Sequence, residues 1–325
     1  MPRLFWSLLL SLILETVLLQ SIAWSAHAAG IYWTNPGNAT IGHANLDGTG
    51  VNNNFMTYYG PSGIDTDGTY LYWTWSGCCS SYDYQHIARS NLDGTGLNND
   101  FINSHAYPSS IAVDGTHIYW GDEFSASTGS LPRPTSIGRA NLDGTGANNT
   151  FIGGVDPSSI AIDSKYLYWT DFVSNTIGRA NLDGTGVNNS FITGAIHPNG
   201  LVTDGTYLYW GNTDTSCGYC NFGSIGRANL DGTGVNNNFI HGVYNANDVA
   251  TDGTYLYWTT RQSTIYRANL DGSAVIPFIY VPQGSGYLED LAVFVPEPST
   301  GLLMIAGLLG LAASRRTRAS AEQLG

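Results

Sequence analysis

One four-residue phrase, Asn-Leu-Asp-Gly, recurs through this chain at intervals of about 40 to 50 residues. A Tyr-Trp pair precedes every copy. The copies begin at Asn45, Asn91, Asn141, Asn181, Asn229 and Asn269. A period of this length with strand-like content indicates an array of small β-sheets rather than one continuous sheet. The repeat therefore limits the possible folds more strongly than any other feature.

Each repeat predicts a four-stranded antiparallel meander. The fourth copy consists of short runs rich in β-branched and aromatic residues, over Ser158–Asp171, Thr176–Gly186 and Asn188–Ile192. A turn signal at Asp163 divides the first of these ranges into two strands. Asp183-Gly184 joins the third strand to the fourth, and glycine suits it because such turns need positive φ.

The second strand of a repeat carries bulky residues on both of its faces. In the fifth copy, Leu208 and Trp210 point to one side of the sheet, while Tyr207 and Tyr209 point to the other. A strand of this kind must be covered on both faces. Neighbouring sheets can supply that cover, and a closed ring leaves no sheet bare, so the pattern predicts a β-propeller.

The two ends of the repeat region support ring closure. The region opens at Gly30–Trp33, which resembles a second strand with no first strand before it. It closes at Glu289–Phe294, which resembles a first strand with no second strand after it. Together they complete one blade. We therefore expect an all-β, six-bladed propeller of four-stranded antiparallel blades, closed by pairing of its N- and C-terminal segments.

Tyr168-Trp169-Thr170-Asp171, followed by Ile-Gly-Arg-Ala-Asn-Leu-Asp-Gly, resembles the YWTD repeat, also called low-density lipoprotein receptor class B. The resemblance covers Gly30 to Val295 and implies a six-bladed β-propeller. It also implies that the aspartate serves packing between blades. Only the fourth copy keeps the aspartate after Tyr-Trp-Thr, since Asp122 of the third copy follows Gly121, so the resemblance implies altered blade contacts, not a lost active site. The other copies have Asn35, Trp75, Asp122, Asn212 and Thr260.

The N-terminus has the three parts of a secretory signal peptide: a basic start at Arg3, an apolar stretch, and Ala26-His27-Ala28. Cleavage is expected after Ala28. This divides the chain into a signal peptide over 1–28, a propeller over 29–295 and a tail over 296–325. A retained membrane anchor is the alternative for the first segment.

The tail begins with Pro296-Glu297-Pro298, continues with an apolar run from Gly301 to Ala313, and ends after Arg315-Arg316. The run is short for a membrane span, which needs about 20 residues, and the arginines favour the cytoplasmic side. The tail resembles the PEP-CTERM sorting signal of Gram-negative bacteria. That resemblance implies export, transient membrane anchoring, processing by an exosortase-type enzyme, and delivery to the cell surface or extracellular matrix. An unprocessed tail anchor is the alternative.

Charge and cysteine content exclude several functions. A net charge of −13 repels phosphate backbones and excludes nucleic acid as a partner. Cys78-Cys79 and Cys217/Cys220 fall in corresponding loops of opposite blades, so local disulfides are expected rather than long-range ones. A thioredoxin-like redox site is not expected, because it would need a βαβ setting. A zinc site is not expected either, because its two cysteine pairs would have to span the ring.

Loop lengths indicate where a ligand would bind. The connection after Tyr-Trp is about twice as long in the second, third and fifth repeats as in the others. Aromatic residues suited to stacking on sugars or packing on a protein gather in or beside these long loops. They are Trp75, Tyr82, Tyr84, Phe124, Tyr219 and Phe222. Their alternative role is to cap the ring and exclude water.

Evidence for catalysis is weak, because the chain has no Gly-x-Ser-x-Gly or His-Glu-x-x-His motif. His105, His197 and His241 lie near connections between repeats and could converge on the central channel of a metal-dependent lactonase or lyase. The favoured function is non-enzymatic binding of an extracellular polysaccharide or protein, with neither metal nor cofactor. A hydrolase or lyase acting on carbohydrate or lactone is the alternative, and a purely structural spacer is a third.

Overall fold

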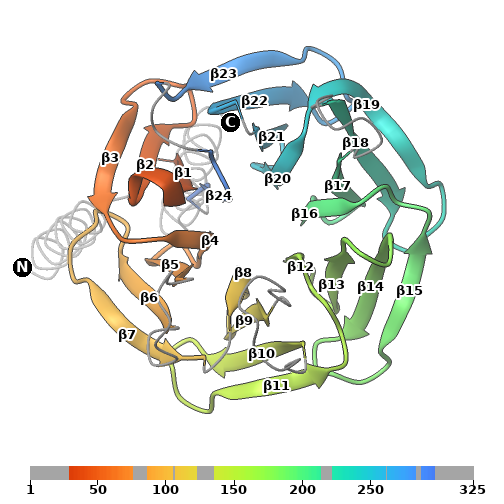
Figure 1. Cartoon of the computed structure of the whole chain (residues 1–325), viewed down its shortest axis with the longest axis horizontal. Helices are drawn as coiled ribbons and strands as arrows, with labels where there is room; N and C mark the ends of the chain where they lie inside the picture. The colour runs from red at the N-terminus through yellow and green to blue at the C-terminus, as the bar shows by residue number, and fades with distance from the viewer. Residues whose placement is uncertain are drawn as a thin grey trace, which may run out of the picture. The chain divides into compact units, whose positions relative to one another are not determined.

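The structure is a computed structural model, which describes residues 29–75, 86–104, 107–122, 135–213, 222–260, 262–282 and 287–296. Strands in these ranges form six four-stranded antiparallel sheets around a central axis (Figure 1). Ala29–Phe294 makes one compact unit. The predicted six-bladed propeller is confirmed. No helix in these ranges is both long enough and apolar enough to cross a membrane.

The blades are numbered in chain order, and their strands are given from the axis outwards. Blade 1 contains β24 (Leu291–Phe294), β1 (Gly30–Asn35), β2 (Thr40–Asn45) and β3 (Asn52–Thr57), with the 3-10 helix η1 (Pro36–Asn38) between β1 and β2. Blade 2 contains β4 (Pro61–Thr66), β5 (Tyr70–Trp75), β6 (His86–Asn91) and β7 (Asn98–Asn103). Blade 3 contains β8 (Pro108–Val113), β9 (His117–Asp122), β10 (Ser136–Asn141) and β11 (Asn148–Gly153).

The remaining blades follow the same plan. Blade 4 contains β12 (Ser159–Ile162), β13 (Tyr166–Asp171), β14 (Thr176–Asn181) and β15 (Asn188–Thr193). Blade 5 contains β16 (Pro198–Thr203), β17 (Tyr207–Thr213), β18 (Phe222–Asn229) and β19 (Asn236–Tyr244). Blade 6 contains β20 (Ala246–Thr251), β21 (Tyr255–Thr260), β22 (Thr264–Asn269) and β23 (Ile276–Tyr280).

Strand β24 closes the ring, as predicted from the two incomplete ends. It pairs antiparallel with β1, with Gly30 opposite Phe294 and Trp33 opposite Leu291. Backbone hydrogen bonds from Thr34 to Asp290 and from Glu289 to Thr34, both 3.1 Å, extend the pairing before the strand begins. The innermost strand of blade 1 therefore comes from the far end of the chain (Figure 1).

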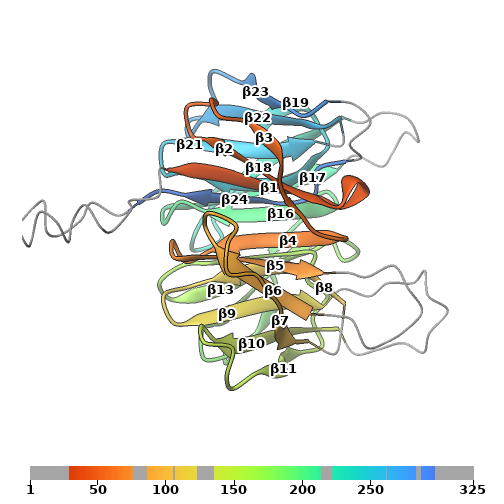
Figure 2. The same ribbon diagram turned by 90° about the vertical axis from the view of Figure 1, so that its left-hand side faces the viewer.

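The two faces of the ring are built by different connections (Figure 2). We call the end at which the innermost strands begin and the second strands end the loop face; Pro61 lies opposite Trp75 there. We call the end that carries the Asn-Leu-Asp-Gly turns the turn face. Gly30 pairs with both Asn45 and Phe294, so the chain enters and leaves the propeller at the turn face.

Packing between blades explains the Tyr-Trp pair. Trp169 of blade 4 is in one buried cluster with Tyr119 of blade 3, while Tyr168 is in the next cluster with Trp210 of blade 5. Each blade thus directs its tryptophan towards one neighbour and its tyrosine towards the other. All six tryptophans and all six tyrosines of the pairs are at most 2% exposed. The expectation that neighbouring sheets cover both faces is confirmed.

A glycine on the third strand leaves room for each tryptophan ring in blades 1, 3, 4 and 5. A Cβ added to Gly178 would lie 2.1 Å from Cε2 of Trp169. Blade 2 has Ala88 at this position, and blade 6 has Tyr266, whose ring stacks on Trp258 with centroids 5.8 Å apart. The glycine is therefore a packing requirement of the blades whose tryptophan lies flat on the third strand.

The repeated phrase forms the turn between the third and fourth strands. Asp183 accepts hydrogen bonds from the backbone NH and the hydroxyl of Thr185, at 2.9 and 2.6 Å. These bonds hold the pKa of Asp183 below its ordinary value. Gly184 adopts φ of +84°, a conformation that favours glycine. A tight hairpin turn accounts for the phrase, and the same hydroxyl bond recurs at Asp47, Asp93, Asp143 and Asp231.

The repeated arginines stabilise the ring from its third strands. The Arg179 guanidinium lies between two rings of its own blade, 4.3 Å from Tyr166 and 4.0 Å from Phe191. Its Nη1 also donates to the Leu230 carbonyl of blade 5 at 3.4 Å, and Arg139 donates in the same way to Leu182 of blade 4 at 3.1 Å. Arginine side chains therefore connect blades 3, 4 and 5.

Candidate functional site

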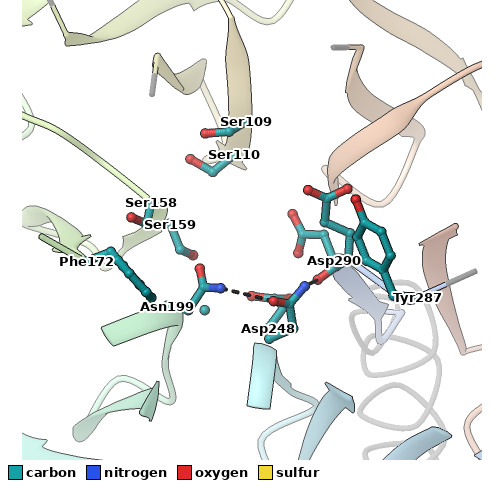
Figure 3. Close-up of a pocket in the computed structure, with 12 residues that line it drawn as sticks. Ser109, Ser110, Ser158, Ser159, Phe172, Asn199, Asp248, Tyr287 and Asp290 are labelled. Atoms are coloured by element: carbon teal, nitrogen blue, oxygen red, sulfur yellow. Dashed lines mark hydrogen bonds between the residues drawn. The ribbon is translucent and has the colours of Figure 1, made fainter. Parts of the chain in front are cut away.

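A pocket of about 780 Å³ opens at the loop face, at the mouth of the central channel (Figure 3). Most of its walls come from the first residues of the innermost strands. Polar side chains predominate, with one aromatic ring on each of two opposite sides. The lining residues are Ser109, Ser110, Ser158, Ser159, Phe172, Asn199, Gly200, Asn247, Asp248, Tyr287, Glu289 and Asp290.

Short polar side chains at one repeat position form the rim. Ser109, Ser158 and Asn199 each follow the proline that precedes or begins an innermost strand, and Asn247 and Glu289 occupy the same position in blades 6 and 1. Asn199 donates from Nδ2 to Asn247 at 3.1 Å. Asn247 in turn donates to the Glu289 carbonyl, also at 3.1 Å. Amide side chains therefore connect blades 5, 6 and 1 along one edge of the pocket.

Two aromatic residues flank the pocket, Phe172 on one side and Tyr287 on the other (Figure 3). Phe172 follows β13 and packs against His197, with ring centroids 4.9 Å apart. Tyr287 precedes β24 and is 47% exposed. Neither residue is among the aromatic residues that the sequence predicted to bind a ligand, because neither belongs to a recurring motif or to one of the long loops.

Asp248 and Asp290 bring two carboxyl groups to the wall formed by blades 6 and 1. Their backbone NH groups donate at 3.0 Å to the hydroxyls of Thr259 and Thr34, the threonines that follow the Tyr-Trp pairs. Each carboxyl also accepts from the next blade: Asp248 from the Leu291 NH and Asp290 from the Ile64 NH, both at 3.0 Å. The two side chains therefore connect blade 6 to blade 1 and blade 1 to blade 2.

Burial raises the pKa of both carboxyl groups. It raises the pKa of Asp290 well above its ordinary value, and the charge of Asp248 raises it further. It raises the pKa of Asp248 to about 6, while the hydrogen bond with Asp290 acts in the opposite direction. Ionisation of both members of the pair at once is therefore disfavoured.

Below the pocket the channel becomes narrower. A second cavity of about 170 Å³ is lined mainly by aliphatic residues of the innermost strands, Ile111, Ile160 and Leu201 among them. Asp65 lines it too: it accepts a 2.7 Å hydrogen bond from the Val113 NH, and burial raises its pKa to about 7. Asp248 and Asp290 line this cavity as well as the pocket, so acidic groups extend into the channel.

The structure describes only some of the aromatic residues that the sequence predicted to bind a ligand. Trp75 is half-buried at the end of β5, stacks on His86 with centroids 6.2 Å apart, and is not among the pocket residues. Phe222 begins β18. Tyr82, Tyr84, Phe124 and Tyr219 lie outside the described residues, as do Cys78, Cys79, Cys217 and Cys220.

Of the histidines considered as metal ligands, the two that the structure describes do not line the pocket. His197 packs on Phe172, and His241 is exposed on the outermost strand of blade 5, whereas His105 lies outside the described residues. Among the residues that the structure describes, no group of three or more His, Cys, Asp or Glu side chains is arranged to hold a metal ion.

Asp122 is a further buried acid at the loop-face end of blade 3. It is 4% exposed, and its Oδ2 accepts from the Ser136 hydroxyl at 3.3 Å. The equivalent Asn212 of blade 5 accepts from Trp210 Nε1 at 3.0 Å and donates to Ser224 at 3.1 Å. Burial raises the pKa of Asp122 to about 8. A neutral carboxylic acid therefore occupies the place that an amide fills in blade 5.

Replacing Asp122 with Asn should stabilise the protein increasingly as pH rises. The folded state keeps the Asp122 proton to about pH 8, whereas the unfolded chain loses it near 3.8, so ionisation favours unfolding between those values. The slope is about 1.4 kcal/mol per pH unit. Urea unfolding at pH 5 and pH 8 should show the advantage of Asp122→Asn over the parent growing, while Asp183→Asn at the turn face shows no such growth. Equal midpoints for Asp122→Asn and the parent at pH 8 would contradict the assignment.

Comparisons with known proteins give matches to the C-terminal tail and to the propeller. Residues 294–316 match the family model described as the PEP-CTERM protein-sorting motif. The chain carries a PEP-CTERM sorting signal. This motif marks a protein that Gram-negative bacteria export and sort to the cell surface, and it implies processing by an exosortase. The matched range contains Pro296, Glu297, Pro298, Arg315 and Arg316.

The propeller is similar to solved structures with different functions. It aligns with a chain of a nidogen/laminin complex with a TM-score of 0.65 and 21% identity, covering 82% of this chain and 98% of that one. It also aligns with a putative 6-phosphogluconolactonase from Bacteroides fragilis with a TM-score of 0.50 and 13% identity, covering 83% and 99%. No curated protein matches the sequence. These similarities establish the fold. They do not determine whether the protein binds a ligand or catalyses a reaction, which depends on the residues of the site.

Proposed function

We propose that this exported propeller binds an extracellular polysaccharide in the loop-face pocket. The observation that carries the proposal is the combination of a 780 Å³ cavity, a polar rim and two aromatic rings on opposite sides. The volume lies within the usual range for small-ligand sites, about 300 to 1,000 Å³. The sorting signal supports the setting, because an exported protein encounters surface polymers.

The lining suits a sugar. The hydroxyls of Ser109 and Ser158 and the amides of Asn199 and Asn247 can exchange hydrogen bonds with sugar hydroxyls. The rings of Phe172 and Tyr287 can pack against the apolar faces of the sugar, since aromatic side chains combine apolar area with defined geometry. A protein partner remains an outcome of the test, but a concave, hydroxyl-lined pocket favours a chain of sugars over a flat protein surface.

Filling the pocket should abolish binding. Ser158→Trp places a large ring at a half-buried rim position, whereas Ser190→Trp places the same ring on the exposed outer strand β15. Both proteins should be recovered from the outside of the producing cells and titrated with those cells' own exopolysaccharide. Ser158→Trp should weaken binding at least about tenfold, because it displaces the ligand from the cavity, and Ser190→Trp should leave it unchanged. Equal binding by both variants would refute the pocket as the site, and retention of a surface protein instead would identify a protein ligand.

Metal-independent hydrolysis of the same polymer is the second candidate. It is favoured by the two carboxyl groups on the pocket wall, Asp248 and Asp290, because burial raises the pKa of both and a carboxyl group with a raised pKa can act as a general acid. A phosphorylated substrate is disfavoured, because no Lys, Arg or His is among the pocket residues that the structure describes. Release of reducing ends in the same assay, lost in Asp290→Asn, would favour the enzyme; binding without release favours the first proposal.

A further inference from the structure

We infer that the pocket selects a saccharide that carries free amino groups. The inference rests on the proposed function, and it concerns the charge of the ligand. The cavity defines where the sugar lies, and its walls contain three acidic residues, Asp248, Glu289 and Asp290. None of the described residues that line it is basic. An anionic sugar would meet like charge on this wall, whereas an ammonium group would meet its complement.

The acids occupy one wall rather than the whole rim. Asp248 comes from blade 6, and Glu289 and Asp290 come from the segment that leads into β24 of blade 1. Serines of blades 3 and 4 form the opposite wall (Figure 3). A sugar held between Phe172 and Tyr287 could therefore direct one substituent towards carboxyl groups and others towards hydroxyls.

Asp248 retains capacity to accept a further hydrogen bond. An ionised carboxylate offers about four lone-pair sites. Asp248 uses these sites for the Leu291 NH at 3.0 Å, for the Val249 NH and for its interaction with Asp290. An ammonium group is a three-fold donor, so it can bind a carboxylate whose remaining lone pairs face the cavity.

The lysine and arginine residues of the described ranges are engaged elsewhere. Each lies over an aromatic ring, and none lines the pocket. Arg139, for example, lies 3.9 Å from the Phe151 ring centroid, and Lys165 lies 4.7 Å from that of Tyr166. The full set is Arg89, Arg139, Lys165, Arg179, Arg227 and Arg267. The negative charge of the pocket wall is therefore not neutralised by these side chains.

The test compares three hexasaccharides with the full exported protein. The probes are a glucosamine hexamer, an N-acetylglucosamine hexamer and a galacturonic acid hexamer, which carry positive, neutral and negative charge. Calorimetric titration should give the glucosamine hexamer an affinity about tenfold above the neutral one, the size of one charge-assisted hydrogen bond. The galacturonic acid hexamer should not bind. Added salt should reduce the difference.

Two isosteric variants assign the effect to the pocket. Glu289→Gln and Asp248→Asn each remove one acid from the wall, and the amide oxygen introduced by Asp248→Asn can still accept from the Leu291 NH. Asp183→Asn removes the same charge from the turn face and is the matched control. The preference for the glucosamine hexamer should fall several-fold in the first two and persist in the control. An equal fall in all three would show adsorption to net charge only and would overturn the inference.

The outcomes separate this inference from the proposed function. Equal affinity for the neutral and amino hexamers, lost in Ser158→Trp, would keep the saccharide site and overturn its charge selectivity. Tighter binding of the galacturonic acid hexamer would do the same. Binding of no hexamer, together with no binding of the cells' own exopolysaccharide, would overturn both.

Discussion

Ending the chain after Tyr287 is expected to abolish cooperative folding of the propeller. The truncation removes Leu288, β24 and the clamps at Asp290, and it exposes a cluster in which Ile31 and Trp33 are fully buried. Full burial of each large aliphatic side chain contributes about 1.5 to 3 kcal/mol. Loss of a whole inner strand therefore approaches the total stability of a domain, about 5 to 15 kcal/mol.

Thermal unfolding followed by near-ultraviolet circular dichroism measures this effect, because the tryptophans report packing between blades. A chain ending at Pro296 is the control, since it keeps β24 (Leu291–Phe294) and removes the sorting tail. The control should unfold in one sharp transition, and the shorter chain should show none. A transition at the same temperature in both chains would mean that the ring does not depend on its closing strand.

The second large effect is expected at the glycine beneath a tryptophan. Gly178→Leu should destabilise the protein by about 3 kcal/mol or more, because its side chain would occupy the space of the Trp169 ring, which is 1% exposed. Gly153→Leu is the matched control, since a Cβ there meets nothing within 4 Å and the residue is exposed. Urea midpoints should fall strongly for the first variant and remain within the error of the parent for the second. Similar midpoints for Gly178→Leu and Gly153→Leu would contradict the packing account.

The sequence predicted the ring because the determinants of blade packing recur. The Tyr-Trp pair, the Asn-Leu-Asp-Gly turn and the two incomplete end segments define strand order and closure without reference to any ligand. The aspartate of the fourth repeat was expected to act between blades. In the structure, Asp171 accepts a 2.7 Å hydrogen bond from the Ser174 NH within its own turn. A single side chain can form a local turn bond that a repeat pattern does not distinguish from a contact between blades.

The pocket could not be predicted with the same success because its residues vary between blades. Glu289, Ser109 and Asn199 occupy one repeat position, yet in the sequence they are ordinary polar residues beside a strand. Tyr287 and Phe172 lie in short connections. The long loops instead favoured Trp75 as a ligand-binding residue, and in the structure Trp75 stacks on His86. Convergence of the innermost strands at the axis makes these residues neighbours, and only the three-dimensional arrangement reveals it.

The positions of the two chain ends determine how the protein would be presented outside the cell. Gly30 and Phe294 pair at one face, and the sorting motif begins at Phe294 itself, without a spacer. The chain therefore leaves the propeller for the tail at the face opposite the one that holds the candidate pocket. A reporter joined directly at Ala29 or at Pro296 would likewise start from the turn face.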